Sequence, residues 1–291
     1  MKKVTMALAA ALMLQSCEYV ATSEVVETKP TASRQKTVTF RISGAEWDTD
    51  GDGITRGSMT ADGNEMTDLW IFDYMGDDLV QMQTLTPDDN TWGAPSFTLK
   101  LGTHQIYFVA SRGDSPTVDD EARTIVWGTP KDTFWSSLTL NVTSGGSTSQ
   151  SVTLNRVATK MRVQITDEVP SGLATVNVTP ATWYYGLNYA TGAATAADSR
   201  ERSVSVPASY IGTTGQLVAS FFGLSNSTEW TTDITITAKD GVGHTLGSAT
   251  ISDAPFQRNR VSSFSGNLFN ATNGLNMSLN AEWQNEYTTT W

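Results

Sequence analysis

From Lys36 onward, apolar and polar residues alternate with the two-residue period of β-strands. The segment KTVTFRIS at residues 36–43 places Val38, Phe40 and Ile42 on one face and polar residues on the other. No segment carries a helical stripe of apolar residues over ten or more positions, so the pattern predicts an all-β protein. Similar strand-like segments occupy residues 68–74, 78–85, 96–111, 137–157, 159–167, 215–225, 232–251, 261–269 and 275–283.

Turn residues separate these segments and predict where the chain reverses. Met75-Gly76-Asp77 indicates one hairpin, and Gly145-Gly146 indicates a second hairpin that closes the first half of the chain. Strands with one apolar and one polar face are typical of antiparallel sheets. We therefore expect two antiparallel β-sandwich domains at residues 37–155 and 156–291, each within the ordinary size of a domain.

The first residues have the features of an export signal. Lys2 and Lys3 precede an apolar stretch at residues 4–14, which is shorter than the roughly 20 residues that span a bilayer. The motif Leu14-Gln15-Ser16-Cys17 resembles a bacterial lipobox, and Cys17 is the only cysteine of the chain. We expect residues 1–16 to be a lipoprotein signal peptide, Cys17 to be acylated and residues 17–36 to form a tether. An ordinary signal peptide with an incidental cysteine is the alternative.

The formal net charge of −11 narrows the set of partners. An acidic chain repels phosphate backbones, which argues against nucleic acid as a ligand. With Cys17 acylated, no thiol would be left for a disulfide or a thiolate metal site.

One acidic segment has part of a calcium-binding pattern. DTDGDG places Asp48, Asp50 and Asp52 at alternate positions, as at the start of an EF-hand loop. Arg56 and Met59 stand where that loop needs further ligands. The segment is therefore a weak calcium candidate, with a solvated acidic turn as the alternative, and we expect no cofactor.

Other chemistry-bearing residues do not form a catalytic motif. We expect His104 and His244 to be exposed loop residues, because neither stands at motif spacing from a nucleophile or a metal ligand. Trp92, Trp127 and Trp135 either stack on sugars or belong to the core. No motif nominates a pair of carboxylates for glycoside hydrolysis, so we expect no enzymatic activity.

Four motifs in this order give the chain a resemblance to a known family. They are the lipobox, DLWIFDYMGDDLVQ at 68–81, LNRVATKMRVQI at 154–165 and RNRVSSFSGNLF at 258–269. Together they resemble the FimA/FimB/Mfa fimbrillin-like lipoproteins of Bacteroidales. The resemblance implies two tandem transthyretin-like β-sandwich domains, export as an outer-membrane lipoprotein to the cell surface, and assembly into a fimbria, or pilus.

The resemblance also implies an assembly mechanism. In polymerising members an arginine-specific protease removes the N-terminal segment with its first strand, and a strand of a neighbouring subunit fills the groove by strand addition. The cleavage candidates here are Arg34 and Arg56, each with an uncleaved surface arginine as the alternative. The donor-strand candidates are Leu275, Met277, Leu279, Ala281 and Trp283, which otherwise form an ordinary edge strand.

The sequence therefore predicts a structural fimbrial subunit, as stalk, tip or anchor. Its expected partners are other fimbrial subunits, the outer membrane through the lipid, and the maturation protease. The alternative is a non-polymerising surface lipoprotein that binds a glycan or a host protein.

Overall fold

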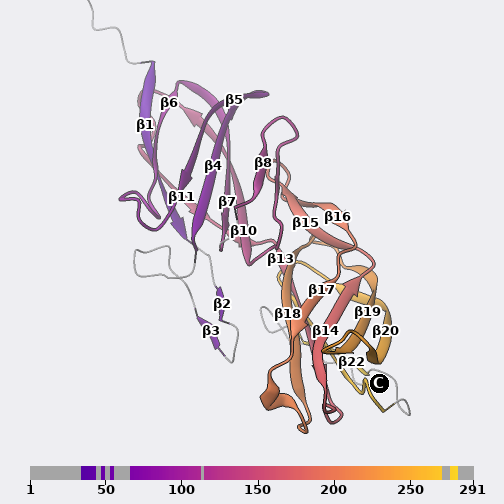
Figure 1. The fold of residues 1–291 in the computed structure, drawn as a ribbon. Coiled ribbons are helices and arrows are strands. Elements are labelled where there is room, and N and C mark those ends of the chain that lie inside the picture. Colours follow the sequence, from indigo (N-terminus) through magenta and orange to yellow (C-terminus); the bar gives the residue numbers. More distant parts are fainter. Residues whose placement is uncertain are drawn as a thin grey trace, which may run out of the picture. The chain divides into compact units, whose positions relative to one another are not determined.

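The structure is a computed structural model that describes residues 34–43, 47–49, 53–55, 66–112, 115–270 and 276–280 (Figure 1). Of 47–49, 53–55 and 276–280 only the backbone is described. The regular elements in these ranges are β-strands and one turn of 3-10 helix, η1 (Ala208–Tyr210), which confirms the all-β prediction for this part of the chain. No helix among the described residues is long and apolar enough to cross a membrane.

Two sheets are formed by strands that lie between residues 35 and 156. One has three strands in the order β11-β1-β6, and the other has five in the order β12-β10-β7-β4-β5. The bounds are β1 (Gln35–Ser43), β6 (Ser96–Lys100), β11 (Ser149–Thr153), β4 (Asp68–Met75), β5 (Asp78–Leu85), β7 (Gly102–Ser111), β10 (Thr133–Val142) and β12 (Asn155–Arg156). A small hairpin pairs β2 (Trp47–Thr49) with β3 (Gly53–Thr55).

These two sheets share one hydrophobic core, as in a sandwich. The three-stranded sheet contributes Phe40 and Phe97, whose rings meet edge to face with centroids 6.0 Å apart. From the five-stranded sheet come Ile71 and Phe108, and the Phe108 ring lies 5.3 Å from that of Phe40. All buried members of this first core fall between residues 38 and 154.

The remaining strands form a second pair of sheets. The larger has the order β22-β21-β13-β18-β15-β9-β8, with β16 also paired to β15, and the smaller has the order β17-β14-β19-β20. The bounds of the larger sheet are β8 (Thr117–Asp119), β9 (Thr124–Val126), β13 (Ala158–Ile165), β15 (Trp183–Asn188), β16 (Ala193–Asp198), β18 (Gln216–Leu224), β21 (Val261–Gly266) and β22 (Asn276–Asn280). Those of the smaller are β14 (Leu173–Pro180), β17 (Arg202–Ser205), β19 (Trp230–Asp240) and β20 (Thr245–Phe256).

A second core lies between these two sheets. Trp183 of β15 is fully buried and meets Phe256 of β20 edge to face, with centroids 4.9 Å apart. Gly223 is required beside it, because a Cβ at that position would lie 2.4 Å from the indole of Trp183. The buried members of this core fall between residues 161 and 268.

The pairing differs from the prediction in two respects. The expectation of purely antiparallel sheets is wrong, because β1 pairs with β11 and β13 pairs with β21 in parallel. The hairpin predicted around Gly145-Gly146 is also wrong: β10 pairs with β7 and β12, whereas β11 crosses to β1 in the other sheet. Turn residues specify where a chain reverses, but not which strand becomes the partner. The hairpin predicted at Met75-Gly76-Asp77 is confirmed by the pairing of β4 with β5.

The central strands β4 and β7 of the five-stranded sheet are buried on both faces over most of their length. In β4, Leu69 and Ile71 enter the first core, whereas Trp70, Phe72 and Tyr74 enter a separate aromatic cluster. That cluster, here called the junction cluster, also contains residues that belong to or flank the larger sheet of the second pair: Ile125, Trp127, Val157, Leu187, Tyr189 and Leu224. It joins the two cores through buried side chains.

Tyr189 lies at the centre of the junction cluster. Its ring stacks on that of Phe72, with centroids 3.9 Å apart and planes 3° from parallel, and its hydroxyl is 2.7 Å from that of Tyr74. Burial and the hydrogen bond with Tyr74 raise the pKa of Tyr189 well above its usual value. The phenol therefore stays neutral and packs as an uncharged group.

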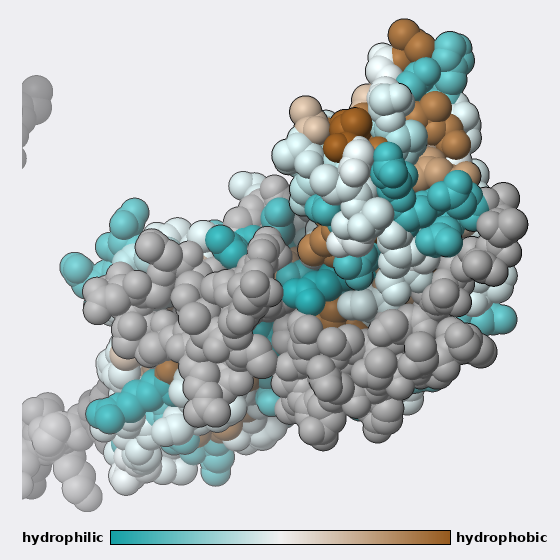
Figure 2. Space-filling model, turned by 90° about the horizontal axis from the view of Figure 1, so that it is seen from below, coloured by the Kyte–Doolittle hydropathy of each residue, from teal (hydrophilic) through white to brown (hydrophobic). Residues whose placement is uncertain are grey.

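The described surface shows hydrophilic and hydrophobic residues interspersed on the face drawn in Figure 2. Large exposed apolar side chains include Met82, Leu101, Leu217, Leu246 and Val242, the last at the tip of the β19–β20 hairpin. Single exposed apolar residues of this kind are normal for folded proteins.

Candidate functional site

β1 is the candidate site with the clearest geometry, because it is a central strand and not an edge. Its first half pairs antiparallel with β6, from Gln35 opposite Lys100 to Thr39 opposite Ser96. Its second half pairs in parallel with β11, from Thr39 opposite Ser149 to Ser43 opposite Thr153. Strand pairing therefore occupies both edges of β1.

The alternation predicted for β1 is confirmed by its burial. Val38, Phe40 and Ile42 are buried in the first core, and the residues between them are exposed or half-buried. Burying side chains of this size stabilises the fold by roughly 1.5–3 kcal/mol each. Loss of β1 would expose three apolar pockets and the backbone edges of β6 and β11.

Of the two cleavage candidates, only Arg34 lies among the described residues. Arg34 is exposed and stands immediately before β1, and its carbonyl oxygen accepts a hydrogen bond of 2.9 Å from the N–H of Leu101. Cleavage after Arg34 would leave β1 in place, and the residues that follow the bond are paired with β6. Arg56 lies outside the described residues, between β3 and β4 in the sequence.

The donor-strand candidates lie at the other end of the chain. Met277 and Leu279 belong to β22, which pairs antiparallel with β21 and is the edge strand of the larger sheet among the described strands. Leu275, Ala281 and Trp283 lie outside the described residues. An edge strand is held by one neighbour, so fewer backbone hydrogen bonds oppose its departure than oppose that of a central strand.

A buried carboxylate holds the chain that leads to β22. Asp167 accepts three backbone N–H bonds, from Leu268 at 3.1 Å, Phe269 at 2.7 Å and Asn270 at 3.0 Å. Gly247 of β20 allows this segment to approach, because a Cβ there would lie 2.6 Å from the carbonyl oxygen of Leu268. Sequence reasoning did not single out Asp167, whose partners are backbone groups about a hundred residues away.

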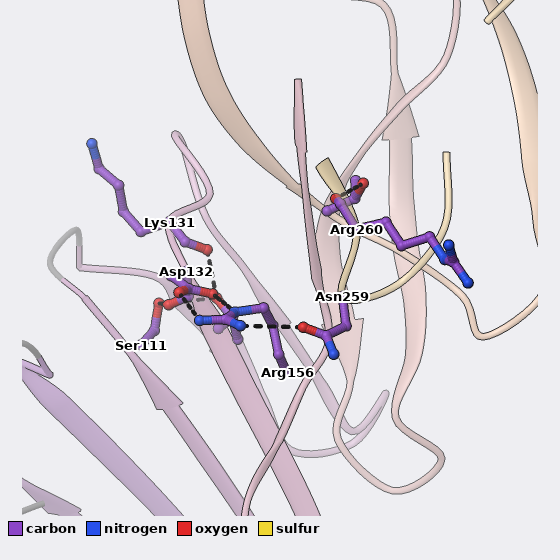
Figure 3. A network of polar contacts seen from close by, with 8 residues as sticks. Ser111, Lys131, Asp132, Arg156, Asn259 and Arg260 are labelled. Carbon is purple, nitrogen blue, oxygen red and sulfur yellow. Dashed lines mark hydrogen bonds and ion pairs between the residues drawn. The ribbon is translucent and has the colours of Figure 1, made fainter. Parts of the chain in front are cut away.

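Two motifs that carried the family resemblance meet in space. The first is the motif at 154–165 and the second is the motif at 258–269. Arg156 of the first binds Asp132 with two hydrogen bonds, Nε to Oδ1 at 2.8 Å and Nη2 to Oδ2 at 2.9 Å (Figure 3). Its Nη1 donates to Oδ1 of Asn259, from the second motif, at 3.1 Å. Arg258 of the second motif donates to the carbonyl oxygens of Ser225 and Gly192.

His104 is not the exposed loop residue that the sequence predicted. It lies in β7 and is completely buried, with Nδ1 2.6 Å from a carboxylate oxygen of Asp73. β7 already begins at Gly102, so His104 is the third residue of the strand, and its side chain lies on a buried face. His244 is exposed at a hairpin tip as predicted, and its Nδ1 donates to a carboxylate oxygen of Asp240 at 3.0 Å.

The three tryptophans considered for sugar stacking have packing roles. Trp92 is buried in the first core and Trp127 in the junction cluster. Trp135 is half-buried, and its indole N–H donates to the carbonyl oxygen of Tyr189 at 2.7 Å. The core alternative is thus the correct one for Trp92 and Trp127.

The remaining predicted residues lie outside what the structure describes. Cys17, Asp50 and Asp52 are outside the described ranges, and of Asp48 only the backbone is described, in β2. The lipidation and calcium predictions therefore stay predictions.

Comparison with solved structures shows which proteins share this fold. At 8% identity and a TM-score of 0.56, the chain resembles a candidate polysaccharide-binding protein from Bacteroides thetaiotaomicron, over 85% of this chain and 96% of that one. The fimbrial anchor protein Mfa2 from Porphyromonas gingivalis matches at 10% identity and a TM-score of 0.52, over 87% and 100%. A candidate adhesin from Bacteroides ovatus matches at 11% identity and a TM-score of 0.52, over 82% and 88%.

At this level of identity the likeness shows the fold, which is that of the fimbrillin-like proteins of Bacteroidales, as the motifs predicted. No curated protein matches the chain. A family model described as a family of unknown function (DUF6562) matches residues 118–291. Because this match covers more than half of its residues, the chain belongs to the DUF6562 family.

Proposed function

We propose that this chain is a structural subunit of a cell-surface fimbria, assembled by strand addition after proteolysis removes its N-terminal segment. The position of β1 is the observation that carries the proposal. It is a central strand with three buried apolar side chains, so its removal leaves a groove of matching shape between β6 and β11. A strand from another subunit would restore both the ladder and the core.

Arg56 fits this mechanism better than Arg34. Cleavage after Arg56 detaches residues 1–56, which include all of β1. Cleavage after Arg34 detaches none of the strand and meets a bond whose carbonyl oxygen is already hydrogen-bonded to Leu101. We assign the donor role to the segment 275–283 around β22, since an edge strand leaves its own sheet at lower cost than a central one.

The same proposal includes export and anchoring. Residues 1–16 would be removed as a signal peptide, Cys17 would be acylated at the outer membrane, and residues 17–36 would be the tether. Two separate cores, one within 38–154 and one within 161–268, support two sandwich domains. We propose that they are transthyretin-like, with bounds of 37–155 and 156–291, and that β8 and β9 of the first range complete the larger sheet of the second. Two or three acyl chains, at about 0.8 kcal/mol per buried CH₂, would hold the subunit on the membrane.

The test compares variants of the full chain expressed in a fimbriated Bacteroidales host. Filaments sheared from the surface are sequenced at their N-termini and viewed by electron microscopy. We expect wild-type subunits to begin at Gly57, and Arg56→Ala to abolish filaments while Arg34→Ala does not. A start at Cys17 on every molecule would exclude the stalk role and leave the anchor. Filaments whose subunits retain β1 would contradict strand replacement.

A second function is favoured by one observation, the fold shared with a candidate polysaccharide-binding protein. In that case the chain is a non-polymerising surface lipoprotein that binds a glycan or a host protein. It would stay monomeric at high concentration after Arg-specific proteolysis, and it would bind on a glycan array. Protease-dependent polymerisation in solution would reject this alternative.

A further inference from the structure

Two arginines stack on one buried tyrosine at the edge of the second core. The guanidinium carbon of Arg200 lies 4.0 Å from the ring centroid of Tyr185, and that of Arg202 lies 5.3 Å from it. Arg202 is also 5.8 Å from the ring of Phe221. Tyr185 belongs to β15, Arg202 begins the edge strand β17, and Phe221 belongs to β18, so regular strands position all three.

Arg202 is held by one of its nitrogens and leaves two others without a partner. Nη1 donates to the hydroxyl of Thr129 at 3.2 Å. Nε and Nη2 are buried, and neither finds an acceptor among the described residues. The hydroxyl of Tyr185, a fully buried residue, likewise has no partner there. Arg202 and Tyr185, which are in contact, thus carry three buried donor groups without a partner among the described residues.

The unpaired nitrogens are the pair that arginine uses to bind carboxylates. Nε and Nη2 point along one edge of the planar guanidinium and match the two oxygens of a carboxyl group. Arg156 of this same chain shows the arrangement, since its Nε and Nη2 bind the two oxygens of Asp132 at 2.8 and 2.9 Å. Arg202 presents the same edge without an Asp or Glu of the described chain to fill it.

Two buried guanidinium nitrogens without acceptors are costly, because the group keeps its charge and these nitrogens have lost their hydration. We propose that Arg202 and Tyr185 form a recognition site for a carboxylate-bearing ligand, which pairs with Nε and Nη2 of Arg202 and accepts the hydroxyl of Tyr185. Thr129 is a positioning residue, because its hydroxyl holds Nη1 of Arg202 and leaves Nε and Nη2 for the ligand. The site stands independently of fimbrial assembly.

Arg200 stacks on the same ring from a partly exposed position. Its side chain is 43% exposed and forms an ion pair of 2.8 Å with Asp198. The hydrogen bond from Arg200, and then the N–H of Ser199, lower the pKa of Asp198, so this carboxylate stays ionised and paired with Arg200. The guanidinium of Arg200 adds a second positive charge on the Tyr185 ring, which would favour an anionic ligand.

Both acidic sugars and peptides carry carboxylates. The probes therefore test first whether a carboxylate is needed for binding, and then which of these two kinds of molecule binds more tightly. The full chain is titrated by NMR with D-glucuronate, with N-acetylglycine and with neutral D-glucose. We expect saturable binding of the first two and none of glucose. Tighter binding of glucuronate assigns the site to acidic sugars, whereas tighter binding of N-acetylglycine assigns it to peptide carboxylates.

Substitutions at Arg202 and Tyr185 test whether these two residues bind the carboxylate. Arg202→Lys keeps the charge but loses the fork, and we expect affinity to fall about tenfold or more. Tyr185→Phe removes only the hydroxyl, so binding should weaken while the melting temperature stays unchanged or rises, because no protein partner is lost. Arg41→Lys, at an exposed arginine of β1, is the matched control and should change nothing.

Equal affinity for glucuronate in wild type, Arg202→Lys and Tyr185→Phe would overturn the proposal, as would the absence of any binding up to millimolar concentration. A crystal soaked with glucuronate that shows only a water molecule on Nε and Nη2 would overturn it too. A clear drop in the melting temperature of Tyr185→Phe would show that the hydroxyl has a structural partner, and would remove it from the site.

Discussion

The imidazole Nδ1 of His104 lies 2.6 Å from a carboxylate oxygen of Asp73, and neither side chain has any exposed surface. The other ring nitrogen, Nε2, is 2.9 Å from the carbonyl oxygen of Lys100. A carbonyl oxygen only accepts, so Nε2 carries a hydrogen and donates it. Gln81 donates to the second carboxylate oxygen of Asp73 at 3.1 Å. This network explains why an acidic residue interrupts the apolar run of β4.

Replacing Asp73 by Ala should destabilise the protein strongly, because His104 then keeps a buried polar nitrogen with no partner. The expected loss is about 3–5 kcal/mol in the free energy of unfolding, measured by urea denaturation. Asp88→Ala, at an exposed aspartate, is the control and should stay within about 0.5 kcal/mol of wild type. The double variant Asp73→Leu/His104→Phe should recover part of the loss; a double variant worse than the sum of both singles would contradict the pairing.

Phe40→Ala tests whether β1 belongs to the first core of the free subunit. Its side chain is completely buried and meets the rings of Phe97 and Phe108, so its truncation should cost about 3–5 kcal/mol. Arg41→Ala, one residue on and exposed, should be nearly neutral. Both are measured by thermal and urea unfolding of the uncleaved chain. Equal stability of the two variants would mean that β1 does not complete the core.

Asp167→Asn should loosen the segment that leads to β22. The amide loses the negative charge and one of the two acceptor oxygens that now receive three backbone N–H groups, and we expect a loss of about 1–3 kcal/mol. Hydrogen exchange should accelerate at the amides of residues 268–270 before it does elsewhere. Glu168→Gln, at the adjacent exposed carboxylate, is the control. Unchanged protection at 268–270 would show that the carboxylate is not what holds this segment.

Tyr189→Ala should separate the two cores energetically. It removes the ring that stacks on Phe72 and the hydroxyl that meets Tyr74, at the centre of the junction cluster. We expect calorimetry to show one unfolding transition for the wild type and two for the variant. Tyr189→Phe keeps the stack and loses only the hydroxyl, so it should cost about 1 kcal/mol and keep a single transition. Two transitions in the wild type would show that the junction cluster does not couple the cores.

Local pattern determined much of this protein. The alternation of Val38, Phe40 and Ile42 correctly indicated a half-buried strand, since side chains on a strand point to opposite faces with a period of two. The run Leu69–Phe72 carried a further signal: consecutive apolar residues indicate a strand buried on both faces, which is how β4 reaches both the first core and the junction cluster. Trp92 and Trp127, by contrast, gave no local sign of whether they were exposed.

Only the tertiary structure decided which strands pair and which polar groups meet. The turn at Gly145-Gly146 marks a reversal of the chain, but β11 joins β1, more than a hundred residues earlier. Asp73 with His104, Asp132 with Arg156, and Asp167 with the amides of 268–270 are contacts between different segments, and the residues joined stand 24 to 103 positions apart. Periodicity reports the environment on one strand, whereas these contacts depend on the register between strands, which is set when the cores pack.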